Sequence, residues 1–123
     1  MAEIKSLLKA IMFVQDMDAQ VRFYRDVLGL QVKMPVGLAS YSDQFWVEFE
    51  TGGCTLVLHG GGQRRIGEDA PKLAFEVADI DTARTALMGR GVKLGEIRSP
   101  AQGVKVCDGV DPEGNHFSLD WHG

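Results

Sequence analysis

The chain has 123 residues, of which 45% are hydrophobic and 24% are charged, a composition typical of one globular domain rather than of a disordered protein. Its formal net charge of −4 offers no long-range attraction to a polyanion, so nucleic acid is not an expected partner. Its apolar runs fall well short of the roughly 20 residues that a membrane-spanning helix needs, and the N-terminus lacks the apolar region of a signal peptide, so we expect a cytoplasmic protein with no membrane partner.

A strand that leads directly into a helix is predicted at the start of the chain. Residues 10–14 form an apolar run, and from residue 17 apolar side chains recur at the spacing of one face of an α-helix. Asp16 or Asp18 can accept hydrogen bonds from the first helical turn, and Gly29 can adopt the left-handed conformation that ends a helix. We therefore predict a strand from residue 9 and a helix within 16–30.

Three more strands are predicted to complete the first half of the chain. Residues 31–34 form a short apolar and polar stretch between the helix and a loop rich in Pro, Gly and Ser. Apolar and polar residues alternate over 45–49, which predicts a strand with one apolar face. Residues 54–59 follow a Gly-Gly turn and are predicted to be the hairpin partner of that strand. The first half is therefore predicted to be βαβββ.

The second half of the chain repeats the design of the first. Asp16 and Asp18 have counterparts 63 positions later, Asp79 and Asp81, and the final apolar strand repeats with a shift of 61. A strong turn signal lies at Asp111–Gly114. The predicted elements are a strand over 72–77, a helix over 80–90, and strands over 92–94, 104–107 and 115–121.

A single domain over residues 1–123 is expected, made of module 5–60 and module 70–122. The Gly-rich stretch at 60–65 lacks the Lys-Ser/Thr ending of a phosphate-binding loop, so we predict a connector between the modules. Cys54 and Cys107 each lie within a predicted strand, and in a reducing compartment we expect buried free thiols rather than a disulfide.

Strand periodicity separates the side chains that pack on the helices from those on the opposite face of each sheet. That opposite face is predicted to mix charged side chains with apolar ones, among them Ile11, Phe13, Val57 and Ala74. An apolar floor with a few polar groups is typical of a small-molecule site. A partly solvated face or a dimer contact would give the same pattern.

Four motifs occur in a fixed order along the chain: Asp16–Asp18, Phe23–Leu30, Phe75–Asp81 and Asp111–Asn115. Together they resemble the vicinal oxygen chelate superfamily, which includes glyoxalase I, bleomycin resistance proteins, fosfomycin resistance enzymes and extradiol dioxygenases, and the resemblance spans nearly the whole chain. It implies an α+β fold of two βαβββ modules that form a cup-shaped half barrel, the glyoxalase/bleomycin resistance fold. It also implies a homodimer.

Metal-dependent members of this superfamily place ligands on the first and last strands of each module. The resemblance carries these positions to Lys9, Val57, Lys72 and Ser118. Lysine is protonated at neutral pH, and removing that proton to bind a metal costs about 4.6 kcal/mol. Val57 has no donor atom. We therefore expect no metal at these positions and no other cofactor.

The leading hypothesis is a metal-independent small-molecule binding protein of the bleomycin-resistance type, with a role in antibiotic resistance. It would sequester an aromatic or charged ligand in a cavity at a dimer interface. Aromatic side chains would supply flat contacts, and charged side chains would meet ionic groups of the ligand. No catalytic residue is assigned. The predicted ligand-binding residues are Lys9, Phe13, Trp46, Glu48, Val57, His59, Lys72, Glu76, Ser118 and Asp120.

The alternative is a glyoxalase-like metal-dependent lyase, isomerase or dioxygenase with non-standard ligands drawn from His59, Glu76, His116 and Asp120. A metal-free enzyme would instead use Lys9 or Lys72 as an amine of lowered pKa toward a carbonyl substrate. A third hypothesis is a protein-interaction subunit whose cavity is filled by its own aromatic side chains. Bound metal would distinguish the first two.

Overall fold

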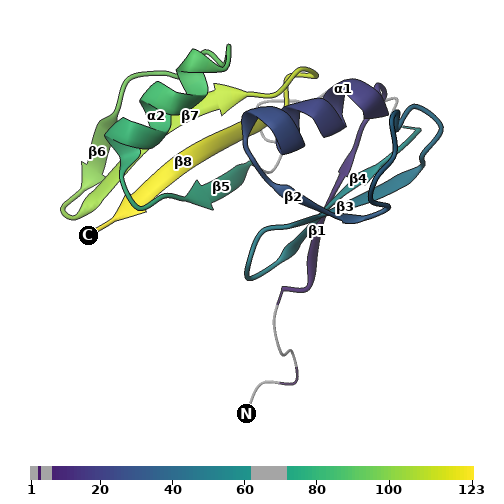
Figure 1. Ribbon diagram of the computed structural model, residues 1–123. Helices are drawn as coiled ribbons and strands as arrows, with labels where there is room; N and C mark the ends of the chain where they lie inside the picture. Colours follow the sequence, from purple (N-terminus) through teal and green to yellow (C-terminus); the bar gives the residue numbers. More distant parts are fainter. Residues whose placement is uncertain (1–2, 4–6, 62–71) are drawn as a thin grey trace. The chain divides into compact units, whose positions relative to one another are not determined.

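The computed structural model describes residue 3, residues 7–61 and residues 72–123, and the chain divides into two compact units, Met1–Arg64 and Arg65–Gly123. We call these units the first and the second module. Each contains a four-stranded sheet and helical structure between its first and second strands (Figure 1). The predicted α+β fold of two βαβββ modules is therefore confirmed. Residues 62–65 of the predicted connector lie outside the described residues, as do the first two residues of each predicted module.

The first module follows the predicted order of elements closely. Its strands are arranged β1-β4-β3-β2, with β1 parallel to β4 and the other pairs antiparallel. The helix begins at the predicted place because the Asp16 carboxylate accepts a hydrogen bond from the Ala19 N–H at 3.0 Å. Gly29, with φ of 78°, ends it. The elements are β1 (Lys9–Phe13), α1 (Met17–Arg22), the π-helical turn η1 (Phe23–Val27), β2 (Gln31–Met34), β3 (Trp46–Glu50) and β4 (Thr55–His59).

The second module repeats this strand order and the register of the parallel pair and the hairpin, whereas the edge strand β6 pairs at a different place on its neighbour than β2 does. Its strand order is β5-β8-β7-β6, again with one parallel pair. Ala10 pairs with Leu56 in the first module, and their counterparts Leu73 and Phe117 pair in the second. Asp79 caps the helix through the Thr82 N–H at 3.0 Å. The elements are β5 (Leu73–Glu76), α2 (Ile80–Gly89), β6 (Arg98–Ala101), β7 (Val104–Val110) and β8 (His116–His122).

The strand predicted over 92–94 is wrong. Val92 and Leu94 are buried, but Leu94 forms only an isolated bridge with Gly109, and the sheet strand β6 lies further along the chain. β6 contains Pro100, which sequence patterns place in a loop. A proline is tolerated there because β6 is an edge strand, where a missing backbone N–H need not break a ladder.

Two smaller differences concern the hairpin of the first module. Phe45 precedes β3 and is 66% exposed, so the apolar face of that strand is formed by Val47 and Phe49 alone. Cys54 precedes β4 rather than lying within it. Both cysteines are free thiols, but only Cys107 is buried as predicted, whereas Cys54 is half-buried. Burial raises the pKa of the Cys107 thiol.

The helices cover one face of each sheet, and the cores lie there. In the first module α1 packs against β4, and Tyr24 of η1 bridges to the sheet by donating its hydroxyl to Met12 Sδ and by a ring contact with Phe49 at 6.2 Å. In the second module α2 packs against β8 and β7 over Phe117 and Leu119. The alternation predicted for β1 and β8 is therefore confirmed at the core-facing positions Met12, Phe117 and Leu119.

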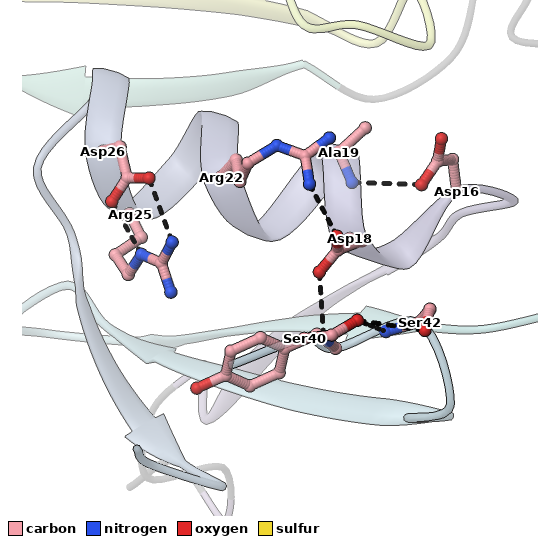
Figure 2. A network of polar contacts seen from close by, with 9 residues as sticks. Asp16, Asp18, Ala19, Arg22, Arg25, Asp26, Ser40 and Ser42 are labelled. Carbon is pink, nitrogen blue, oxygen red and sulfur yellow. Dashed lines mark hydrogen bonds and ion pairs between the residues drawn. The ribbon is translucent and has the colours of Figure 1, made fainter. Parts of the chain in front are cut away.

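Asp18 joins α1 to the loop between β2 and β3. One carboxylate oxygen accepts a hydrogen bond from the Tyr41 N–H at 2.8 Å, and the other forms an ion pair with Arg22 at 2.6 Å (Figure 2). The Tyr41 bond and Arg22 hold the pKa of Asp18 below its usual range. Tyr41 is buried and donates its hydroxyl to Pro35 O at 2.8 Å. The loop is therefore fixed on the helix before the chain enters β3.

No helix in the described part of the chain is both long and apolar enough to cross a membrane.

Candidate functional site

Six of the ten predicted ligand-binding residues share one face of the first sheet, opposite α1. Side chains that are paired in a ladder project to the same face. Between β1 and β4, Lys9 pairs with Thr55 and Phe13 pairs with His59. Between β3 and β4, Trp46 pairs with His59 and Glu48 pairs with Val57. The six residues are Lys9, Phe13, Trp46, Glu48, Val57 and His59.

An aromatic cluster made of Phe13, Phe45, Trp46 and His59 occupies one end of this face. The centroid of the His59 ring lies 4.6 Å from that of Phe13, 5.6 Å from that of Trp46 and 6.2 Å from that of Phe45. Trp46 and Phe45 meet the imidazole at steep angles of 72° and 85°. Such edge contacts are favourable for aromatic pairs and hold the rings in defined positions.

Phe45 belongs to this cluster, although the sequence pattern placed it with the core of the sheet. The signal that could have identified it lies in Gly60 and Gly61. A Cβ atom at Gly60 would lie 3.3 Å from the Phe45 Cα, and one at Gly61 would lie 3.1 Å from the Phe45 ring. The two glycines therefore leave room for an aromatic side chain at this position.

Two charged side chains hold Trp46 in place. Its indole N–H donates to Glu48 Oε2 at 2.8 Å, and the Lys9 ammonium lies 5.3 Å from the centre of its ring. The second contact is a cation–π interaction. The indole is therefore fixed at its edge and over its face, and one cation and one carboxylate flank the aromatic cluster.

The same face exposes much apolar surface. Ile11 is 49% exposed and Phe13 is 45% exposed, while Val57 is completely buried at its base. Contiguous exposed apolar side chains beside a few charged groups are typical of binding surfaces. This surface can bind a flat, apolar molecule, and the charged side chains beside the aromatic cluster can contact an ionic group at the edge of that molecule.

The corresponding face of the second module carries a polar network beside the apolar side chains of Ala74, Val106 and Val110. Lys72 and Arg98 both pair with Asp108, at 3.1 and 2.7 Å, and the hydrogen bond from Arg98, followed by that from Lys72, holds the pKa of Asp108 below its usual range. Ser118 Oγ donates to Asp120 Oδ1 at 2.5 Å. Sequence reasoning missed Asp108, because the register that places it opposite Ser118 follows only once the hairpin is known.

A shallow hollow lies where β5 and β8 end. It is lined by Glu76, Val77, Ala78, Trp121 and His122. Glu76 was predicted as a ligand-binding residue, whereas Trp121 and His122 were not. The Lys105 ammonium lies 5.3 Å from the centre of the Trp121 ring, so one face of that indole already carries a cation.

Equivalent positions in the two modules carry different kinds of side chain, aromatic rings in the first and carboxylates in the second. Phe13 and His59 pair in the first ladder, and their counterparts Glu76 and Asp120 pair in the second. The described residues thus place the aromatic surface on the first module and carboxylates on the second.

The metal site of the superfamily does not fit the residues at its four positions. Val57 offers only carbon, the Lys72 ammonium is paired with Asp108, and Ser118 donates its hydroxyl to Asp120. Within the described residues no three His, Cys, Asp or Glu side chains lie close enough together to hold a metal ion. We therefore derive no chemistry through a metal at these positions.

Comparison with known proteins agrees with this architecture. The family model described as glyoxalase-like domain matches residues 10–119. No curated protein sequence matches the chain.

Several solved structures share the fold. TnmS3, an antibiotic binding protein from Streptomyces sp. CB03234, is 18% identical over 100% of both chains, with a TM-score of 0.77. A glyoxalase family protein from Enterococcus faecalis is 20% identical over 94% of this chain and 97% of its own, with a TM-score of 0.76. A lactoylglutathione lyase from Agrobacterium tumefaciens is 20% identical over 97% of this chain and 95% of its own, with a TM-score of 0.72. At these identities the likeness establishes the fold alone.

Proposed function

This chain belongs to the glyoxalase-like domain family, within the vicinal oxygen chelate superfamily, and on that premise we propose that it is a metal-independent small-molecule binding protein of the bleomycin-resistance type. It sequesters an aromatic or charged ligand in the cytoplasm, in a cavity at the interface of a homodimer. The aromatic cluster on the first module carries the proposal. The antibiotic-binding protein from Streptomyces with the same fold supports it.

The ligand-binding surface is built for a flat ring. Phe13 and Trp46 present aromatic surface beside the buried Val57, and aromatic contacts contribute about 0.5–1.5 kcal/mol each beyond the area that they bury. Lys9 meets an anionic substituent of the ligand. Glu48 uses one carboxylate oxygen to hold Trp46, which leaves the other for a cationic group.

Trp46→Ala is the direct test of this site. The probe is 2-naphthoate, which combines a flat aromatic ring with one negative charge, and binding is measured by isothermal titration calorimetry. We expect the substitution to weaken binding about ten-fold, because it removes both the stacking surface and the support of Lys9. Trp121→Ala, which removes the tryptophan of the second module, is the matched control. An unchanged affinity in Trp46→Ala would remove Trp46 from the site.

Dimerisation is supported by the exposed apolar side chains of the first module. Ile11 is 49% exposed and Phe13 is 45% exposed on the same face, and Phe45, which contacts His59 beside Phe13, is 66% exposed. Covering such a patch removes apolar surface from water and stabilises an assembly. Sedimentation equilibrium should give a mass of two 13.5 kDa chains. A monomer at micromolar concentration would contradict the interface part of the proposal.

A metal-dependent lyase, isomerase or dioxygenase is the second candidate, because a lactoylglutathione lyase shares the fold. The donor set at the superfamily positions favours the first proposal, since none of the four residues is a conventional ligand. Elemental mass spectrometry of protein purified without chelator or histidine tag separates the two. About one divalent ion per chain, lost in His59→Ala, would support the enzyme. A value near zero after incubation with nickel, zinc, manganese and iron would support the binding protein.

A further inference from the structure

The geometry of His59 points to a narrower class of ligand, an inference that rests on the proposed function. We propose that His59 selects aromatic ligands that carry an O–H or N–H group, by accepting a hydrogen bond from that group at Nε2.

The hydrogen bond on the other ring nitrogen determines which nitrogen can accept. His59 Nδ1 lies 2.7 Å from the carbonyl oxygen of Gly60. A carbonyl oxygen can only accept, so Nδ1 carries the proton. In the neutral imidazole Nε2 is then the bare nitrogen, with a lone pair in the plane of the ring.

The surroundings of the imidazole leave this lone pair to a ligand. Phe13, Phe45 and Trp46 contact the ring and offer no acceptor or donor to Nε2, because the indole N–H of Trp46 is already bonded to Glu48. Within residues 7–61 and 72–123 no hydrogen bond to Nε2 is formed. The ring is half-buried, so a ligand that covers the cluster also removes water from Nε2.

Selection follows from what happens to Nε2 when a ligand covers it. A ligand with a donor replaces the lost water, whereas a ligand of the same shape without a donor leaves a desolvated acceptor. Sites that contain a polar group for this purpose discriminate against analogues that lack the matching group. Because His59 is only half-buried, we expect a difference in affinity of about three- to ten-fold.

Two probes isolate the donor. 2-Naphthol and 2-methoxynaphthalene share the same bicyclic ring and an oxygen at the same position, but only 2-naphthol has an O–H group. Their affinities for the full chain are measured by isothermal titration calorimetry at about pH 8, where imidazole side chains are generally neutral. We expect 2-naphthol to bind about three- to ten-fold more tightly.

The variant His59→Phe retains a ring of similar size and removes Nε2. The two probes should then bind with equal affinity, whereas His116→Phe, at an exposed histidine on β8 of the second module, should retain the preference. Imidazole nitrogen NMR of the unmodified protein supplies an independent reading. The Nε2 resonance of His59 should shift differently with the two probes, because 2-naphthol replaces the hydrogen bond from water whereas 2-methoxynaphthalene only removes it.

The outcomes separate this inference from the proposed function. Equal affinity of both probes for the unmodified protein, or the same Nε2 shift with both probes bound, would overturn the role of His59 and leave the binding protein intact. If none of 2-naphthol, 2-methoxynaphthalene and 2-naphthoate binds, both the role of His59 and the proposed binding function are overturned. If His59→Phe does not fold, the probe ratio and the NMR shift in the unmodified protein still decide.

Discussion

At the scale of single residues, Asp111 organises the hairpin between β7 and β8. Its carboxylate accepts hydrogen bonds from the backbone N–H groups of Glu113 and Asn115, each at 2.9 Å, and from the Asn115 side-chain amide at 2.7 Å. Asp111 and Asn115 are both buried. A carboxylate that accepts several N–H bonds closes a turn and satisfies donors that water cannot reach.

Asp111→Ala is therefore expected to lower the free energy of unfolding by about 2–4 kcal/mol, because it leaves the Asn115 donors buried without acceptors. Urea denaturation followed by circular dichroism measures the change. Asp43→Ala, at an exposed aspartate in a loop of the first module, is the control and should change stability by less than about 0.5 kcal/mol. Equal effects of the two substitutions would mean that the hydrogen bonds of Asp111 contribute nothing net.

At the scale of elements, Gly109 shows how closely β7 is packed. A Cβ atom at this position would lie 2.8 Å from Leu94 and 2.9 Å from Phe117. Gly109→Ala should therefore lower the free energy of unfolding by about 1–3 kcal/mol through overpacking, measured by urea denaturation.

The matched control for Gly109 is Gly89, the last residue of α2. A Cβ there would meet nothing within 4 Å. Gly89→Ala should raise the free energy of unfolding by up to about 1 kcal/mol, because alanine loses less backbone entropy in a helix. If both glycine substitutions destabilise equally, close packing around Gly109 is not the cause.

Elements were predictable where one local signal determined them. The helix caps Asp16 and Asp79, the glycine at the end of the first helix and the turn at Asp111 each act within a few residues of sequence. The position of β6 was predicted wrongly because Val92 and Leu94 have the apolar pattern of a strand, whereas Pro100 is a residue typical of loops. Which segment joins the sheet edge depends on pairing with β7, which the local pattern does not contain.

The candidate site was predictable only in part. Alternation along β1, β3 and β4 places the predicted residues of the first module on one face, and the ladders of the structure have the same alternation. Phe45 and Asp108 were missed, because their partners His59 and Lys72 are distant in sequence and are brought near by strand register. A pattern in the sequence identifies a face but not the contacts across it.

At the scale of the whole molecule, ion pairs make the free energy of unfolding depend on pH. Hydrogen bonds from Arg98 and Lys72 lower the pKa of Asp108, and a bond from Arg25 lowers that of Asp26. A carboxylate whose pKa is lower in the folded state stabilises that state above its ordinary value of 3.8. This contribution is lost as the pH falls through the lowered folded-state pKa.

The expected result is a loss of stability as the pH falls from about 5 to 2. Asp108→Asn should be less stable than the unmodified chain at neutral pH, and the gap should narrow below pH 3.8 as the native carboxylate also becomes protonated. Urea midpoints measured across this range test it. Asp43→Asn, at an exposed carboxylate, should follow the unmodified chain throughout. A difference in stability between the two chains that does not change with pH would show that the charge of Asp108 is not the cause.

The parallel ladders of the two modules have the same register, which makes the chain its own template for engineering. Positions in the parallel ladder of one module have counterparts in that of the other, so we expect side chains exchanged between them to meet the same backbone geometry. Glu76→Phe together with Asp120→His would graft the Phe13 and His59 pair onto the second parallel ladder. Because the two modules share this ladder, the side chains on one module can be changed while the other module keeps its own.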